Sequence, residues 1–201
     1  MMEENKYKLA GWLAVCQAVL FPVAVSIGII EAVVAKELFH ERRPFIGPSD
    51  LIMIAFTAIG VYTMLMFRRL LHERYEYHEL DLLIIISIWW AIVFQVIGLV
   101  LGVLVMIYWP VNITIMAVTY AVFFTGAMVT IGIVDIMIAT RLLKGTVAFS
   151  DSIRYLAYIT MAAGICEVTV LLSVFSLILI PVSAIMLAMV FFRDRQEVEF
   201  V

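Results

Sequence analysis

One uncharged run constrains this chain more than any other feature of its sequence. No acidic or basic side chain occurs between Asp81 and Asp135, a stretch of 53 residues numbered 82–134. A single helix needs only about 20 apolar residues to cross a bilayer. The run is therefore expected to cross twice and to turn back at Tyr108-Trp109-Pro110-Val111-Asn112, because proline cannot continue a helix and asparagine favours turns.

The composition of the whole chain points the same way. Hydrophobic residues make up 65% of the sequence and charged residues 14%, and the mean hydropathy is +1.12. Soluble globular proteins have roughly 45–50% apolar and about 25% charged residues, and a globule of 22.7 kDa lacks the interior to bury the excess. These values exclude a soluble enzyme, a disordered chain, a coiled coil and a secreted disulfide scaffold. They predict an all-α, polytopic transmembrane helical bundle.

We expect six spans within a single integral membrane domain that covers residues 1–201. Residues 155–192 carry only one charge, Glu167, and are long enough for two short spans. One long helix kinked at Pro181 would give five spans instead. The six expected spans lie near 10–34, 50–71, 82–108, 112–140, 155–173 and 176–192.

Basic residues near the ends of the spans favour six crossings over five. With six, ten lysines and arginines share one side and three lie on the other, whereas five crossings give eight and five. Because basic residues collect on the cytoplasmic side, we expect six spans with both termini in the cytoplasm. The ten are Lys6, Lys8, Arg68, Arg69, Arg74, Arg141, Lys144, Arg154, Arg193 and Arg195, and the three are Lys36, Arg42 and Arg43.

The residues missing from the spans exclude several kinds of membrane chemistry. All three histidines, His40, His72 and His78, fall in expected loops, and no lysine falls within a span. A bis-histidine haem, a histidine-box diiron site, a retinal Schiff base and a Ser–His protease are therefore excluded, and we expect no cofactor. His72 and Glu76 are four residues apart and are weak candidates for a metal site on one helical face. The alternative is a solvated extension of the second span.

Acidic residues at depth are the main functional signal. Asp135 and Glu167 lie within expected spans, and Glu31 lies near an interface where it could reach lipid headgroups. A charged side chain at the bilayer centre costs at least about 2.5–3.5 kcal/mol. No basic side chain lies in the interior of an expected span, since Arg68 and Arg69 fall in the last turn of the span near 50–71. Each deep acid is therefore expected to be protonated, hydrated or neutralised by a cation. At 1.5 Å per residue, Glu167 would lie about 20 Å deep and Asp135 about 9 Å deep.

Small residues accompany the deep polar side chains and indicate close helix packing. Gly98 and Gly102 form a GxxxG pattern beside Gln95, while Ala163 and Gly164 share a helical face with Glu167. We therefore predict that the two stripes face each other and that Gln95 reaches Glu167. The candidates for ion or proton binding are Glu167, Asp135 and Gln95, and those for helix packing are Gly98, Gly102, Ala163 and Gly164.

Three classes of function remain, and the deep acids favour transport of a proton, a cation or a small solute. A non-catalytic membrane subunit or assembly factor explains the same small residues, which would pack against a second copy or another membrane protein. An intramembrane enzyme is least supported, because the expected depths of Asp135 and Glu167 differ by about 10 Å. The lipid bilayer is the expected partner, and the net charge of −3 argues against nucleic acid.

Overall fold

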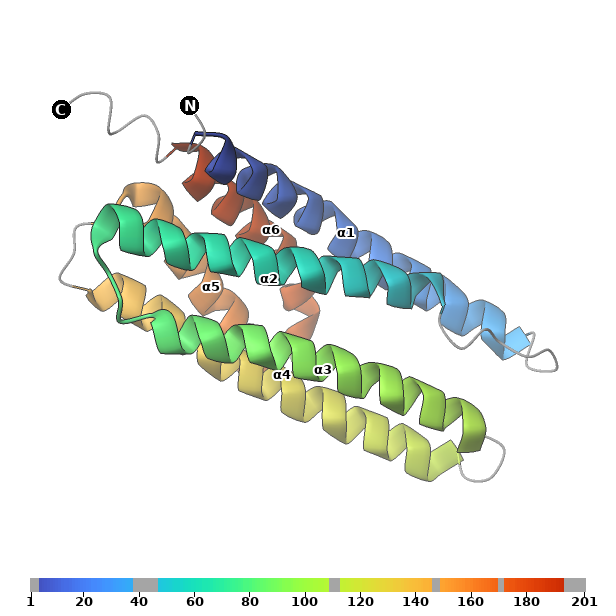
Figure 1. The fold of residues 1–201 in the computed structure, drawn as a ribbon. Coiled ribbons are helices and arrows are strands. Elements are labelled where there is room, and N and C mark those ends of the chain that lie inside the picture. The colour runs from blue at the N-terminus through green and yellow to red at the C-terminus, as the bar shows by residue number, and fades with distance from the viewer. Residues whose placement is uncertain (1–3, 38–46, 109–112, 146–148, 170–171, 194–201) are drawn as a thin grey trace.

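The protein is a bundle of six α-helices, seen in a computed structural model that describes residues 4–37, 47–108, 113–145, 149–169 and 172–193. These residues contain no strand, so the predicted all-α fold is confirmed (Figure 1). The helices are α1 (Glu4–Glu37), α2 (Pro48–Tyr75), α3 (Asp81–Tyr108), α4 (Ile113–Lys144), α5 (Asp151–Val168) and α6 (Ser173–Arg193).

Five of these helices are long and apolar enough to cross a membrane, namely α1 to α4 and α6. The remaining helix, α5, has 18 residues, which gives a length of about 27 Å at 1.5 Å per residue. It carries three charged residues, Asp151, Arg154 and Glu167. A hydrocarbon core is about 30 Å thick. The chain is accordingly a multi-pass integral membrane protein with five or six spans.

The last apolar stretch forms two separate helices, α5 and α6, as predicted, and not one long helix. The break follows Val168, a few residues earlier than expected. The hydroxyl of Thr169 lies 2.9 Å from the carbonyl oxygen of Ile165 and 3.1 Å from that of Cys166. The backbone N–H of Thr169 also donates to the carbonyl oxygen of Ile165 over 3.1 Å, so this threonine caps the last turn of α5. The predicted turn after Tyr108 falls on residues 109–112, outside the described part of the chain.

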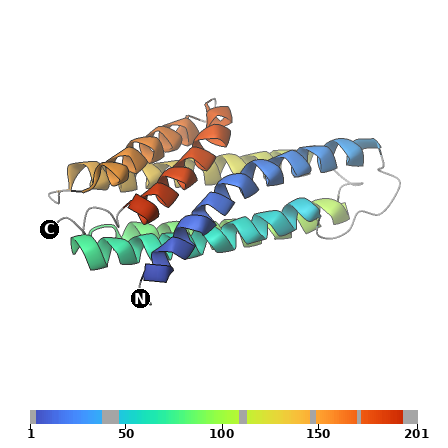
Figure 2. The same ribbon diagram turned by 90° about the horizontal axis from the view of Figure 1, so that it is seen from above.

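The helices pack in a ring. Each of the six contacts its two neighbours in the order α1, α2, α3, α4, α5, α6 and back to α1. The α4–α5, α1–α6, α5–α6 and α1–α2 contacts are extensive, whereas α3 makes smaller contacts with α2 and α4. The hairpin of α5 and α6 is shorter than the other helices and turns part-way along them (Figures 1 and 2).

Alanines allow the close approach of α1 and α6. Ala10, Ala14 and Ala18 are buried along α1, and Ala184 and Ala188 are buried along α6. The rings of Tyr7 and Phe191 stack at 6.3 Å between the same two helices. Small side chains let helices approach closely in lipid, where dispersion contacts drive their association.

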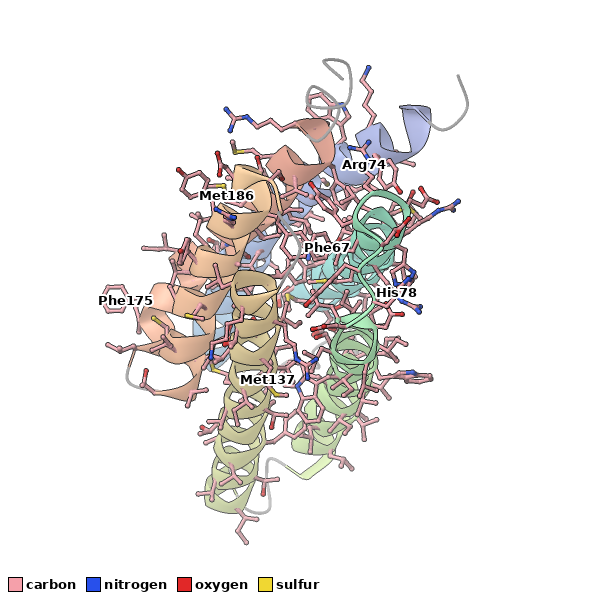
Figure 3. All side chains as sticks on the ribbon, turned by 90° about the vertical axis from the view of Figure 1, so that its left-hand side faces the viewer. Phe67, Arg74, His78, Met137, Phe175 and Met186 are labelled. Atoms are coloured by element: carbon pink, nitrogen blue, oxygen red, sulfur yellow. The ribbon has the colours of Figure 1, made fainter. Side chains whose placement is uncertain are left out.

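The hydrophobic core gathers at the end of the bundle where α1, α3 and α5 begin and α2, α4 and α6 end, which we call the basic end. Phe67 points into the bundle at this end (Figure 3). Phe175, at the start of α6, points away from the bundle (Figure 3). Arg68 pairs with Asp81 across the α2–α3 turn. The most deeply buried large apolar side chains are Leu70, Leu71, Leu80, Ile84, Ile153 and Val190.

The opposite half of the bundle is more loosely packed around α3 and α4. A Cβ atom added to Gly98, Gly102 or Gly126 would meet no described atom within 4 Å. These helices extend beyond the α5–α6 hairpin (Figure 1). Gly98, Gly102 and Gly126 therefore make no close contact within the described chain.

Candidate functional site

Glu167 lies on the face of α5 that packs against α4. Its exposed fraction is 5%, and Ala163 and Gly164 are buried one turn before it. Ala163 and Gly164, both predicted to pack against another helix, thus lie in the same helix contact as Glu167. Gly132 of α4 lies opposite, because a Cβ atom on Gly132 would lie 2.7 Å from the carbonyl oxygen of Gly164 and 2.9 Å from the Cβ atom of Glu167.

Asp135 lies one turn beyond Gly132 on α4 and is half-buried. Its carboxyl group is close enough to Glu167 for the two to interact electrostatically. Side chains on a helix lean toward its N-terminus, which directs Glu167 along α5 toward the level of Asp135. The depth difference of about 10 Å expected from the sequence was therefore too large, because each depth was counted from a different basic residue and the register of the packed helices was unknown.

One oxygen of Glu167 is buried and has no hydrogen-bond partner among the described residues. No described lysine or arginine lies within ion-pair distance of Glu167 or Asp135. Buried polar atoms normally have a partner, and a lone charge in a region of low dielectric constant is costly. The pair can satisfy both conditions by holding a proton, a water molecule or a cation.

A cavity of about 280 Å³ lies along α4 on the side of the basic end. It extends from Lys144 to Ile136, the residue after Asp135, and neither carboxyl group lines it. Met137, one of its lining residues, is seen from the basic end in Figure 3. The remaining lining residues are Glu79, Thr140, Arg141 and Gly145.

Gln95 lies on α3 and takes part in a different polar contact. Its side-chain oxygen accepts a hydrogen bond of 3.2 Å from the hydroxyl of Thr57 on α2. The predicted pairing of Gln95 with Glu167, and of Gly98 and Gly102 with the α5 stripe, is therefore wrong. The reason is the ring order of the helices, which places α4 beside α5.

A second amide joins α1 to α2 in a similar way. The hydroxyl of Thr63 donates to the side-chain oxygen of Gln17 over 3.3 Å. Gly60 makes room for this amide, since a Cβ atom on Gly60 would lie 2.9 Å from Nε2 of Gln17. Threonine partners of membrane glutamines were missed in the sequence because a threonine is common in apolar spans and carries no charge.

Glu31 is held at the far end of the bundle by the start of α2. Its carboxylate accepts hydrogen bonds from the backbone N–H of Ser49 at 3.3 Å and from the hydroxyl of Ser49 at 2.5 Å. An anion is favoured at a helix N-terminus, where the backbone N–H groups are free to donate. Glu31 therefore joins α1 to α2.

His72 and Glu76 do not share a helical face, because α2 ends at Tyr75 and Glu76 takes a left-handed conformation with φ of 49°. The structure brings His72 to His78 and Asp81 instead, with one potential ligand atom from each lying within 4.8 Å of the others. The spacing of His72, His78 and Asp81 in the sequence does not match a helical or strand repeat, because the three residues lie on both sides of the turn between α2 and α3.

Scans of the chain against protein-family models, curated proteins and solved structures found no match.

Proposed function

We propose that the protein binds a proton at the Asp135–Glu167 pair and carries it across the membrane. The observation that supports this proposal is the buried oxygen of Glu167, which has no hydrogen-bond partner among the described residues and lies beside a second acid. An ionisable group inside a membrane is most often part of an ion or proton path. A partner-free oxygen next to another carboxyl group can accept a shared proton.

A proton fits this pair better than a metal cation does. Calcium takes six to eight oxygen ligands and magnesium six, whereas the α4–α5 contact offers two carboxyl groups from Asp135 and Glu167. Gly132 and Gly164 bring the helix backbones together there, which restricts the volume beside the acids. Two neighbouring carboxyl groups that share one proton titrate as a coupled pair.

The cavity along α4 supports access to the pair from the basic end. It reaches Ile136, the residue next to Asp135, and its polar lining residues include Thr140 and Arg141. Water in such a cavity could deliver a proton to the acids through hydrogen-bonded chains. The looser packing of α3 and α4 in the opposite half supports exit on the other side.

Proton flux into liposomes that contain the purified protein tests this function. A pH-sensitive dye inside the vesicles reports flux after a potassium gradient with valinomycin sets the membrane potential. We expect the protein to carry protons faster than empty liposomes do. Glu167→Gln should lower this flux at least tenfold, and Asp135→Asn should lower it as well, because neither amide can release a proton.

Asp151→Asn is the matched control, since Asp151 is an exposed carboxylate on the same helix as Glu167. It should leave the flux unchanged. Circular dichroism and size-exclusion chromatography establish that each variant is folded. Flux that is equal in Glu167→Gln and the wild type, or absent from the wild type, contradicts the proposed function.

A membrane subunit without transport activity is the second candidate function. It is supported by Gly98 and Gly102, whose faces meet no described atom within 4 Å and resemble the small-residue surfaces on which membrane helices associate. Gly98→Cys should then form a disulfide-linked dimer if a second copy packs there, whereas Gly164→Cys, which faces α4, should not.

We further infer that the basic end faces the cytoplasm, which places both termini there. Arg68, Arg141, Arg154 and Arg193 all lie toward this end of their helices, and basic residues favour the cytoplasmic side. Reporter fusions at each terminus test the orientation. A fluorescent reporter that folds only in the cytoplasm should be active at both ends of the chain.

A further inference from the structure

The turn between α2 and α3 brings two histidines and an aspartate together at the basic end. Nε2 of His72 lies 2.5 Å from Oδ1 of Asp81, and Nδ1 of His78 lies 3.9 Å from Oδ2 of the same carboxylate. The centroids of the two imidazole rings are 4.2 Å apart. The three side chains form one compact group, which we call the His–His–Asp cluster.

The backbone explains why these residues meet. α2 ends at Tyr75, and the left-handed conformation of Glu76 reverses the chain so that the N–H of Tyr77 donates to the carbonyl oxygen of Leu71 over 3.2 Å. His78 thereby returns over the last turn of α2, which carries His72. α3 then begins at Asp81, whose carboxylate is favoured at a helix N-terminus.

The donor set suits a divalent transition metal. Two imidazole nitrogens and one carboxylate oxygen are the ligands found in many zinc sites that keep a position open for water. Zinc bonds of about 2.0–2.2 Å place tetrahedral ligand atoms roughly 3.4 Å apart. The 3.9 Å separation of His78 and Asp81 is close to this spacing, and the contact of His72 with Asp81 would widen by about 1 Å as the metal replaces their shared hydrogen.

The three side chains of the His–His–Asp cluster differ in their exposure to solvent. The side chains of His72 and Asp81 are 26% and 29% exposed, so both are held by their surroundings. The side chain of His78 is 66% exposed and can rotate onto a metal at little cost. The cluster is therefore half preformed and open to solvent on one side.

Arg68 supports the carboxylate from its other edge. Its Nε and one terminal nitrogen donate to the two oxygens of Asp81 at 2.9 and 3.0 Å. A group that orients a metal ligand in this way normally strengthens the site, while the positive charge of Arg68 partly neutralises the carboxylate. We expect an affinity below that of a four-ligand structural zinc site.

We propose that His72, His78 and Asp81 bind a divalent transition metal ion, with Zn²⁺ the best fit, and that water fills the remaining coordination positions. The bound ion would join the end of α2 to the start of α3. This site lies in the α2–α3 turn and shares no residue with the Asp135–Glu167 pair, so it stands or falls independently of proton transport.

Metal titration of the whole protein tests the site. The protein is purified in detergent without a polyhistidine tag, and Co²⁺ binding is followed by its visible absorption while Zn²⁺ binding is followed by calorimetry. We expect one saturable site per chain. His78→Gln should weaken binding at least tenfold and remain folded, because His78 is exposed.

Two variants serve as controls. Glu76→Gln changes an exposed acid beside the cluster, and His40→Ala removes the histidine that lies elsewhere in the sequence, so both should bind the metal as the wild type does. Zn²⁺ should also raise the melting temperature of the wild type more than that of His78→Gln, since ligands that bind the folded state stabilise it. Absence of saturable binding, or equal binding by His78→Gln and the wild type, overturns the proposal.

Discussion

Gly132 of α4 and Gly164 of α5 lie backbone to backbone in the α4–α5 contact, in the last turns of α5. A Cβ atom on Gly132 would lie 2.7 Å from the carbonyl oxygen of Gly164, and one on Gly164 would lie 2.6 Å from that of Gly132. Neither carbonyl can move without moving its helix. This reciprocal contact sets the separation of the two helices that carry Asp135 and Glu167.

Gly132→Ala should therefore destabilise the protein by about 1–3 kcal/mol, the usual cost of overpacking a close contact. Thermal unfolding in detergent, followed by circular dichroism, measures the change. Gly126→Ala is the matched control on the same helix, because a Cβ atom there meets no described atom within 4 Å. An equal loss of stability in both variants would show that the backbone contact does not limit the packing.

The α1–α6 contact predicts a second pair of variants with opposite outcomes. Ala14 is fully buried against the bundle, so Ala14→Leu should cost about 1–3 kcal/mol by overpacking. Cys16 lies two residues away on the exposed side of α1, and Cys16→Leu should change the stability by less than about 0.5 kcal/mol. Chemical or thermal unfolding of both proteins in the same detergent makes the comparison direct.

The threonine–glutamine contacts should each contribute little to stability. Thr57→Val removes the hydrogen bond to Gln95, and such bonds between membrane helices are worth about 0.6 kcal/mol on average. We expect a loss of that size in thermal unfolding and no change in proton flux, since Gln95 lies outside the Asp135–Glu167 pair. A large fall in the flux of this variant would instead place the α2–α3 contact in the proton path.

Tyr77 makes the stability of the basic end depend on alkaline pH. Burial, and next the negative charge of Glu79, raise the pKa of Tyr77 from its ordinary value of 10.0 to about 12. Because the folded state favours the protonated phenol, this contribution is complete below pH 10 and is lost as the pH rises through about 12. The stability of Tyr77→Phe should therefore fall less between pH 10 and 12 than that of the wild type.

Tyr77→Phe should also lose about 1 kcal/mol at neutral pH, because no phenol hydroxyl is left to donate to the carboxylate of Glu79, at 3.2 Å, or to the carbonyl oxygen of Arg141, at 3.3 Å. Tyr155→Phe is the control, since Tyr155 is 56% exposed on α5. Denaturation at a series of pH values tests both effects. Parallel pH curves for wild type and Tyr77→Phe would contradict the assignment to this phenol.

Charge and hydropathy in the sequence determined the class of fold and most helix positions. The uncharged run between Asp81 and Asp135 required two long helices, which the structure shows as α3 and α4. The basic residues favoured six crossings, and the structure has six helices, five of which are long and apolar enough to cross a membrane. These features follow from the cost of placing charges and unsatisfied backbone groups in lipid, which acts on each segment separately.

The candidate site was predictable only in part. Glu167 and Asp135 stand out in the sequence because unpaired acids are rare in apolar spans. The depths counted along the sequence did not predict that the two side chains are neighbours. The sequence did not predict that His78 and Asp81 lie next to His72, because the helix was expected to continue through Glu76. Only the left-handed turn at Glu76 brings these three side chains together.

Tertiary structure alone decided which helices are neighbours. A span surrounded by lipid gains no hydrophobic energy from choosing one apolar partner over another, so hydropathy does not distinguish α3 from α4 as the partner of α5. The choice depends on how closely two surfaces fit. The Gly132–Gly164 contact is such a fit, and it places Asp135 beside Glu167.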